Sequence, residues 1–297
     1  MPSPRPRGVG IILAGGRGTR FGDPLKCLKP VCGVPMLLRV AAALQPHVEK
    51  LVVATTKGHG PIAWLAETWG MDVVYTEGRG YERDVKQLAE LAPAVIAACD
   101  LPFLTPSHVR RIMSSDVMAT GLSEGEPVGL TWLPNGDLDE WTTVELGSLV
   151  NVNSREDWLR SESLCSRPTY PLLVDPNTLL PHEDVEGEVE IGEYLRPIAV
   201  DAWSCVVLDG HHRLAYAKRH GIALPVVPMS YSALDVYAKD GAPISKLEVL
   251  SAAARGAVMG VRATRHFYRG IHLSALNHAS VKISEIAGRH PLVCSPI

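Results

Sequence analysis

Short apolar runs alternate with amphipathic stretches through residues 9–112. Four of the runs have the length and the β-branched content of buried strands: 9–13, 51–54, 72–75 and 94–98. Helical spacing follows at 61–69 and 82–91, and Thr105-Pro106 supplies the N-cap and first residue of another helix. Strands that alternate with helices predict a doubly wound α/β sheet, in which ligands bind at the carboxyl ends of the strands.

The pattern is less regular in the second half of the chain. A polar stretch with proline at 161–171 shows no periodicity, so we place a linker there. Beyond it we expect four short strands: 172–174, 197–201, 205–208 and 224–228. A helix from His211 to His220, ended by Gly221, follows the third of these strands. We therefore expect two domains, an α/β domain at 8–160 and an α+β domain at 171–297.

Composition narrows the classes of function. With 46% hydrophobic and 21% charged residues, the chain is that of an ordinary globular protein. The formal net charge of −3 gives no global basic field, so we expect no nucleic-acid partner. Apolar runs fall short of a bilayer span, and the Pro/Arg-rich start lacks the core of a signal peptide. We expect a cytoplasmic protein without a membrane partner, and the sequence leaves its oligomeric state open.

The cysteines do not form a metal-binding pattern. There are six of them: Cys27, Cys32, Cys99, Cys165, Cys205 and Cys294. No pair has CxxC spacing, and no second Cys/His pair at zinc-finger spacing follows the first two. We expect them to be reduced and mostly structural.

A glycine-rich loop follows the first strand. It consists of Leu13, Ala14, Gly15, Gly16, Arg17, Gly18, Thr19 and Arg20. The glycines allow the backbone to approach a ligand closely, and the arginines suit phosphate groups. The loop lacks the Gly-Lys-Ser/Thr of a Walker A motif. With Lys26 it resembles the LxGGxGTRxG…K loop of nucleotidyltransferases, which implies nucleotide binding by the loop and a catalytic role for Lys26.

Two further segments resemble one branch of that superfamily. The stretch from Gly78 through Gly80 to Asp84 resembles the GKGY…D segment of archaeal adenosylcobinamide-phosphate guanylyltransferases, which are MobA-like. The resemblance implies that these three residues bind nucleotide and that GTP is the donor. Asp100 follows a predicted strand, where the superfamily keeps a metal-binding aspartate, so it is the expected Mg²⁺ ligand.

The segment at 116–150 departs from the family pattern. It is short, and we expect only a strand at 128–133, a turn at 134–137 and a strand near 142–146. The usual acceptor-binding segment is not recognisable. The domain therefore has either full transferase activity or nucleotide binding without efficient transfer.

The second domain is organised around the sequence from Asp209 to Arg213. A strand, a tight turn and a helix are expected there, with Asp209 as the helix cap and the first turn as an anion site. Gly210, His211, His212 and Arg213 complete a DGHHR sequence. It resembles the signature of the ParB/sulfiredoxin-like fold, and most closely that of archaeal free-serine kinases.

Two other pieces of that signature occur in the expected order. Glu183 follows a Pro-His pair upstream, and a Thr264-Arg265-His266 triplet lies downstream in a predicted loop. The resemblance implies that Glu183 activates a substrate hydroxyl and that Asp209 holds Mg²⁺ or contacts the hydroxyl. The remaining DGHHR residues and the triplet would bind the phosphates of ATP or ADP.

The two resemblances together predict a bifunctional enzyme of cobalamin biosynthesis. A kinase that phosphorylates free L-threonine would be fused to a cobinamide-phosphate guanylyltransferase, because cobalamin assembly uses a linker derived from L-threonine phosphate. One alternative is a free L-serine kinase with a degenerate nucleotide-binding domain. A methyl pocket gives only ~1–3 kcal/mol of preference between the two amino acids, and its residues are not identifiable. The other alternative is a nucleotide-dependent, ParB-like DNA-binding regulator.

Overall fold

The computed structural model describes residues 8–187, 189–286 and 289–296, and it divides into two compact units. Of the described residues, unit 1 comprises those within 8–31, 36–67 and 71–164, and unit 2 comprises those within 32–35, 68–70 and 165–296. Two short segments from the N-terminal half thus belong to the second unit. The second domain predicted from the sequence, 171–297, does not include them. Within the described residues, no helix has the length and apolar character needed to cross a bilayer.

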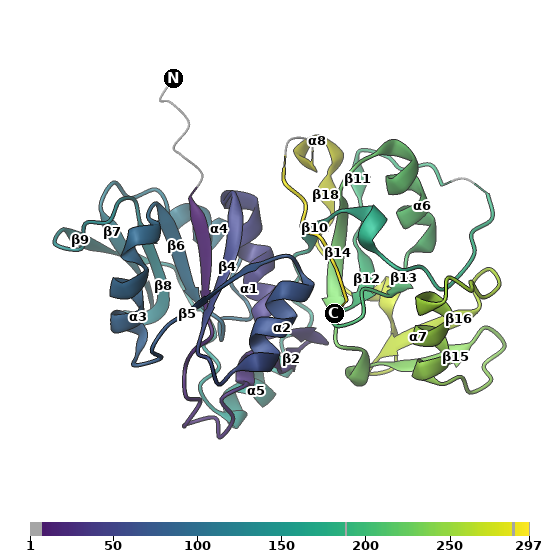
Figure 1. The fold of residues 1–297 in the computed structure, drawn as a ribbon, viewed down its shortest axis with the longest axis horizontal. Helices are drawn as coiled ribbons and strands as arrows, with labels where there is room; N and C mark the ends of the chain where they lie inside the picture. Colours follow the sequence, from purple (N-terminus) through teal and green to yellow (C-terminus); the bar gives the residue numbers. More distant parts are fainter. Residues whose placement is uncertain (1–7, 188, 287–288, 297) are drawn as a thin grey trace. The chain divides into compact units, whose positions relative to one another are not determined.

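Unit 1 is built on a seven-stranded sheet (Figure 1). Its strand order is β5 (Asp72–Tyr75), β4 (Lys50–Thr55), β1 (Val9–Leu13), β6 (Ala94–Ala98), β8 (Glu126–Leu133), β7 (Met118–Ser123) and β9 (Trp141–Glu145). The strands from β5 to β6 are parallel, and β8 is antiparallel to β6. The predicted α/β fold with a mainly parallel sheet is confirmed for this unit.

Helices pack against this sheet because their apolar faces match its buried strands. The helices of unit 1 are α1 (Met36–Leu44), α2 (Gly60–Thr68), α3 (Tyr81–Leu88), α4 (Pro106–Ile112) and α5 (Arg155–Glu162). Val85 and Leu88 of α3 join Ile11 and Leu13 of β1 in one core. Thr105 caps α4 with its side chain, as predicted, and Pro106 takes the first helical position.

The predicted hairpin across 134–137 is wrong. β8 forms its hairpin with β7 through Glu124 and Gly125, and β9 instead runs parallel to β7. The sequence analysis missed β7 because Gly121 and two polar residues interrupt its apolar alternation. With β7 present, the sheet extends through the segment that the sequence analysis judged short.

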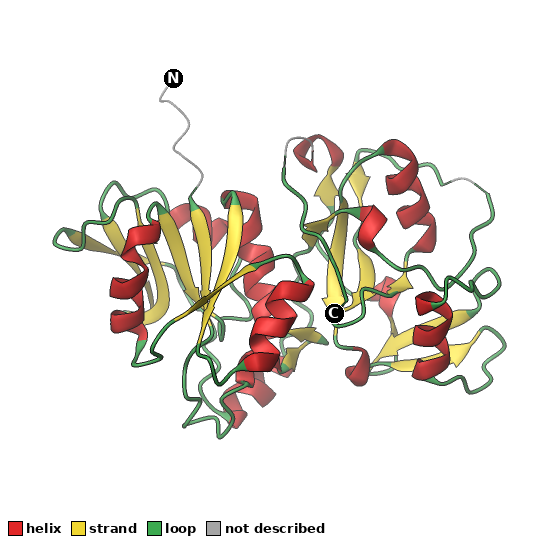
Figure 2. Cartoon of the chain, viewed as in Figure 1, coloured by secondary structure: helices red, strands yellow, loops and turns green. Residues whose placement is uncertain are grey.

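Unit 2 is an α+β arrangement, as predicted, of small sheets and short helices (Figure 2). Its main sheet has the order β10 (Leu172–Val174), β14 (Leu224–Met229), β12 (Ile198–Asp201) and β13 (Val207–Asp209). A three-stranded sheet contains β15 (Asp235–Ala238), β16 (Thr264–Tyr268) and β17 (Ile271–His272), and a pair joins β11 (Tyr194–Leu195) to β18 (Val281–Lys282). The helices are α6 (His211–His220), α7 (Lys246–Ala254) and α8 (Ile283–Ile286).

Two local predictions for unit 2 are wrong. The Thr264-Arg265-His266 triplet is not a loop, because it begins β16 and pairs with β15. Asp209 does not cap α6: the N-cap is Gly210, in a left-handed conformation with φ 98°, and no side chain caps the helix. Gly221 ends α6 in the left-handed conformation, as expected.

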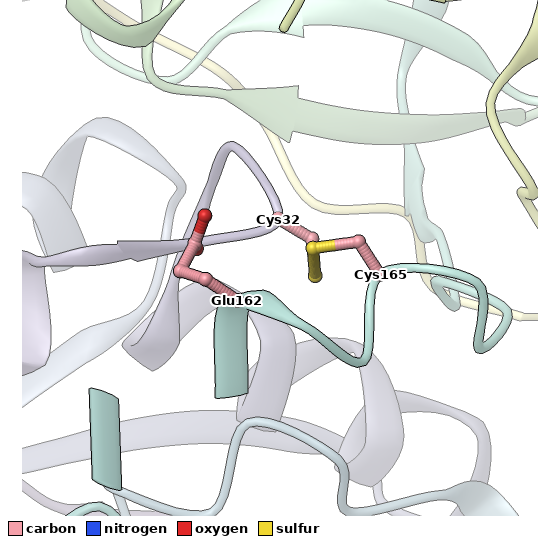
Figure 3. Close-up of side chains that lie close together, drawn as sticks. All are labelled: Cys32, Glu162 and Cys165. Atoms are coloured by element: carbon pink, nitrogen blue, oxygen red, sulfur yellow. A yellow bond between two sulfur atoms is a disulfide. The ribbon is translucent and has the colours of Figure 1, made fainter. Parts of the chain in front are cut away.

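The cysteines are also not reduced as expected, because all six lie in disulfides. The pairs are Cys27–Cys99, Cys32–Cys165 and Cys205–Cys294. Figure 3 shows the second pair, which belongs to unit 2. Sequence spacing did not reveal the pairs because their partners lie 72 to 133 residues apart and only the fold brings them together.

Candidate functional site

Unit 1 contains a cavity of about 720 Å³ beside the ends of β1 and β6. Most of the predicted nucleotide-site residues line it: Leu13, Gly15, Gly16, Arg17, Gly18, Thr19, Arg20, Lys26, Gly78, Gly80, Asp84 and Asp100. Ala14 is the exception. It is buried, and its carbonyl accepts a hydrogen bond from Thr55 Oγ1 at 3.2 Å, so it supports the loop from behind.

Lys26 and Asp100 form the charged centre of this cavity. Lys26 Nζ donates to Asp100 Oδ2 at 2.5 Å and to the Val152 carbonyl at 3.0 Å. The other carboxylate oxygen, Asp100 Oδ1, is buried and has no hydrogen-bond partner among the described residues. Such an orphaned hard oxygen next to a phosphate-type loop fits a divalent cation such as Mg²⁺.

The glycines bring two loops into close contact. Gly78 has φ 61°, and a side chain there would collide with Thr56 and with the Gly15 carbonyl. Glycine is therefore required at this position by both its conformation and its neighbours. The backbone of the glycine-rich loop stays open toward the cavity as a result.

Other residues complete the wall of the first cavity. Arg20 donates to Asn153 Oδ1 at 2.9 Å, and burial raises the pKa of Asp84. The Tyr81 hydroxyl donates to Thr131 Oγ1 at 3.0 Å, and burial raises its pKa well above the ordinary value. The sequence analysis did not assign a role to Asn153, which lies in the segment from residue 149 to residue 153. That segment is a loop, and its Val152 amide donates to the Asp100 carbonyl at 2.9 Å.

Unit 2 contains a second cavity, of about 640 Å³. All nine of the residues predicted for the second site line it: Glu183, Asp209, Gly210, His211, His212, Arg213, Thr264, Arg265 and His266. The structure thus brings together three sequence pieces that span more than eighty residues. Lys239 and Arg262 also line the cavity, and the sequence analysis missed them because they belong to no recognisable motif.

Glu183 is firmly held at the wall of this cavity. Its Oε1 accepts the Thr264 backbone N–H at 2.7 Å and the Thr264 hydroxyl at 2.6 Å, and its Oε2 lies 3.4 Å from His211 Nδ1. Burial opposes ionisation, but the interactions with His182, Thr264 and His211 outweigh it and lower the pKa of Glu183 to about 2. Glu183 is therefore an oriented carboxylate at neutral pH.

Two histidines around Glu183 are neutral. Burial lowers the pKa of His211 and of His266 to about 3 in each case. His211 is therefore a neutral imidazole, and its contact with the donor phosphates stays a prediction. His266 Nε2 lies 2.9 Å from the Tyr231 hydroxyl, and its buried Nδ1 has no hydrogen-bond partner among the described residues.

The Arg213 guanidinium forms hydrogen bonds within the protein. It donates to Asp209 Oδ2 at 2.8 Å and to the Pro197 carbonyl at 2.5 Å. Its charge is thus partly neutralised by Asp209, which in turn has one oxygen occupied. Among the described residues, the exposed Arg and Lys side chains that line the cavity are Arg265, Arg262 and Lys239, and such cations suit the phosphates of a ligand.

Comparison with known proteins identifies the family of unit 1. Residues 10–143 match the profile of the MobA-like NTP transferase domain. The N-terminal part of the chain, residues 10–143, is thus a MobA-like NTP transferase domain. The match includes the short segments 32–35 and 68–70 of unit 2, and it ends before residue 165, where the main part of unit 2 begins.

Curated relatives of this domain are guanylyltransferases. The molybdenum cofactor guanylyltransferase of Burkholderia ambifaria is 31% identical over 116 residues, which are 37% of this chain and 57% of that protein. The probable molybdenum cofactor guanylyltransferase of Haloferax mediterranei is 31% identical over 121 residues, which are 38% of this chain and 57% of that protein. The chain thus spans little more than half the length of these relatives. A solved nucleotidyl transferase from Methanothermobacter aligns with 52% of this chain and 96% of its own, at 20% identity and a TM-score of 0.43.

Proposed function

We propose that unit 1 transfers the guanylyl group of GTP to a phosphate-bearing acceptor. An acceptor phosphate oxygen attacks the α-phosphorus, and pyrophosphate leaves. Mg²⁺ held at Asp100 would neutralise charge on the phosphates. Lys26 binds the triphosphate and orients it, and the glycine-rich loop donates backbone N–H groups to it. The observation that carries the proposal is the Lys26–Asp100 pair beside the loop, with Asp100 Oδ1 left without a partner.

The acceptor proposed is adenosylcobinamide phosphate. The Gly78–Asp84 segment favours it, because it resembles the branch of the superfamily that acts on this compound. The names of the curated relatives favour a second acceptor, the molybdenum cofactor. Pyrophosphate release from GTP with each acceptor distinguishes them.

The Lys26→Ala variant tests the site itself. It should abolish pyrophosphate release and weaken GTP binding, while any activity of unit 2 remains. If Lys26→Ala releases pyrophosphate at the wild-type rate, this assignment fails. If it also stops the activity of unit 2, the two sites are not independent.

For unit 2 we propose a kinase that phosphorylates the hydroxyl of free L-threonine with ATP or ADP. Glu183 would accept a hydrogen bond from the substrate hydroxyl, and Arg265, Arg262 and Lys239 would bind the donor phosphates. The convergence of Glu183, Asp209 and the Thr264 triplet on one cationic cavity carries this proposal. Together the two units would serve cobalamin biosynthesis.

The low pKa of Glu183 defines its part in the reaction. A carboxylate with a pKa of about 2 is a weak base, so it does not remove the hydroxyl proton before the phosphoryl group moves. Phosphoryl transfer commonly has a loose transition state, in which positioning of the nucleophile contributes most. Glu183 therefore orients the hydroxyl and receives its proton late.

Product analysis with both amino acids tests the kinase proposal. Purified protein with Mg²⁺ and ATP or ADP should give O-phospho-L-threonine, and Glu183→Gln should give none. L-serine as the better substrate would instead support the serine kinase alternative. Equal turnover by wild type and Glu183→Gln would remove Glu183 from the reaction.

A further inference from the structure

The Cys27–Cys99 disulfide joins the chain next to both members of the Lys26–Asp100 pair. Cys27 directly follows Lys26 in the chain, and Cys99 directly precedes Asp100. The cross-link therefore joins the two segments that carry these side chains, although 72 residues separate the cysteines. Neither of the other two disulfides neighbours a predicted site residue in the sequence.

Lys26 lies in a short local turn. Its backbone N–H donates to the Asp23 carbonyl at 3.3 Å, and its carbonyl accepts from the Lys29 N–H at 2.9 Å. Lys26 begins a single 3-10 turn, Lys26–Leu28, which follows the glycine-rich loop and has no side-chain cap. Asp100, by contrast, directly follows the central strand β6 and Cys99, whose amide donates to the Leu13 carbonyl at 3.0 Å. The disulfide thus cross-links this short turn to the end of the central strand, one residue away from each charged group.

We propose that the Cys27–Cys99 disulfide positions Lys26 against Asp100 and that its reduction impairs the first site. The proposal rests on the guanylyltransferase function proposed for unit 1. A dithiol reductant supplies two electrons and two protons, the sulfur–sulfur bond breaks to two thiols, and the reductant becomes a disulfide. The freed segment then samples other positions, and misplacement of a catalytic group by about 1 Å can cost 10²-fold in rate.

The place of the disulfide also links its reduction to ligand binding. Both cysteines line the cavity, and their exposed fractions are only 3% and 4%. Bound GTP should therefore slow the reduction of this pair.

The experiment uses the full chain in oxidised and reduced forms, with mass spectrometry to assign the thiols. Cys27→Ser with Cys99→Ser removes the cross-link, and Cys205→Ser with Cys294→Ser is the matched control in unit 2. We expect the first double variant to need more Mg²⁺ and to lose roughly tenfold or more in kcat/KM for GTP, through KM as well as kcat. The control should match wild type in guanylyl transfer.

Several results would overturn the proposal. One is a first double variant with wild-type kcat, KM and Mg²⁺ dependence. Another is free thiols at both positions after air oxidation. A third is equal reduction rates with and without GTP·Mg²⁺.

Calorimetric measurement of GTP binding to the oxidised and the reduced chain tests the positioning role independently of the proposed guanylyl transfer. If no acceptor supports transfer, the proposed function fails, yet weaker GTP binding after reduction still supports the positioning role. Equal affinities in the two forms refute it. Thermal unfolding of both double variants shows whether a loss reflects general destabilisation, which would also lower the affinity of unit 1 at temperatures near its melting point.

Discussion

Replacement of Thr264 by valine is the sharpest test of how the second site is built. The Thr264 hydroxyl lies 2.6 Å from Glu183 Oε1 and 2.8 Å from His182 Nε2, so it bridges a carboxylate and an imidazole. Valine has nearly the same shape and removes only the hydroxyl. The His182 ring keeps its other bond, in which Nδ1 donates to the Val207 carbonyl at 2.7 Å.

The burial of these groups determines how much stability the substitution removes. Thr264 is 8% exposed, His182 is 0% exposed and the Glu183 side chain is 9% exposed, so the hydroxyl and both of its partners are largely buried. Each buried polar group left without a partner costs about 1–3 kcal/mol. Glu183 keeps the Thr264 backbone N–H, so we expect a total loss of about 2–4 kcal/mol in the unfolding free energy of unit 2 at pH 7.

The effect should depend on pH in a definite direction. The pKa of Glu183 is lowered from 4.5 to about 2 in the folded protein, so its ionised interactions stabilise the fold above pH 4.5. That stability is lost as the pH falls from 4.5 toward 2. Without the hydroxyl the pKa of Glu183 should rise toward 4.5, so the difference between wild type and Thr264→Val should be largest at pH 7 and smaller at pH 3.

Hydrogen exchange of the β16 amides in urea measures this difference, because it reports unit 2 separately from unit 1. Thr264→Ser is the matched control, since it keeps the hydroxyl and removes one methyl group. The reasoning fails if valine and serine destabilise unit 2 equally. It also fails if the valine effect is the same at pH 3 and pH 7.

Two other substitutions test the charged groups of the cavities. Asp100→Asn removes the negative charge of the expected cation ligand, so GTP binding should require at least roughly tenfold more Mg²⁺, whereas unchanged Mg²⁺ dependence in calorimetry would exclude Asp100 as a ligand. Arg265→Ala removes an exposed cation from the second cavity, so KM for ATP or ADP should rise roughly tenfold while KM for the amino acid stays the same. A rise in the amino-acid KM instead would place Arg265 at the substrate rather than at the donor.

The sequence predicted the parallel part of unit 1 because local signals and tertiary structure agree there. β1 and β6 are uninterrupted apolar runs, and the residues that follow them carry the predicted chemistry. The edge of the sheet was not predictable in the same way. β7 has a mixed pattern, and the pairing of β9 with β7 depends on a long-range contact that has no local signature.

The candidate sites also have a part that the sequence predicted and a part that it did not. The motif residues gather around two cavities, because each motif places several side chains on one turn. Their individual roles depend on neighbours that the sequence does not identify. Burial, with His182 nearby, lowers the pKa of His211, although Glu183 opposes this shift. Asp209 binds Arg213 instead of capping α6. The disulfides were missed for this reason too, since proximity of cysteines is a property of the fold.

Phosphorus NMR of the full chain tests the two-site account most directly. Wild type, Lys26→Ala and Glu183→Gln would each be incubated with Mg²⁺, ATP or ADP, and L-threonine or L-serine. The account predicts a new phosphomonoester signal, dominant with L-threonine, in wild type and Lys26→Ala and none in Glu183→Gln. Absence of any phosphoamino acid in the wild type with both donors, or its loss in Lys26→Ala, would contradict the account.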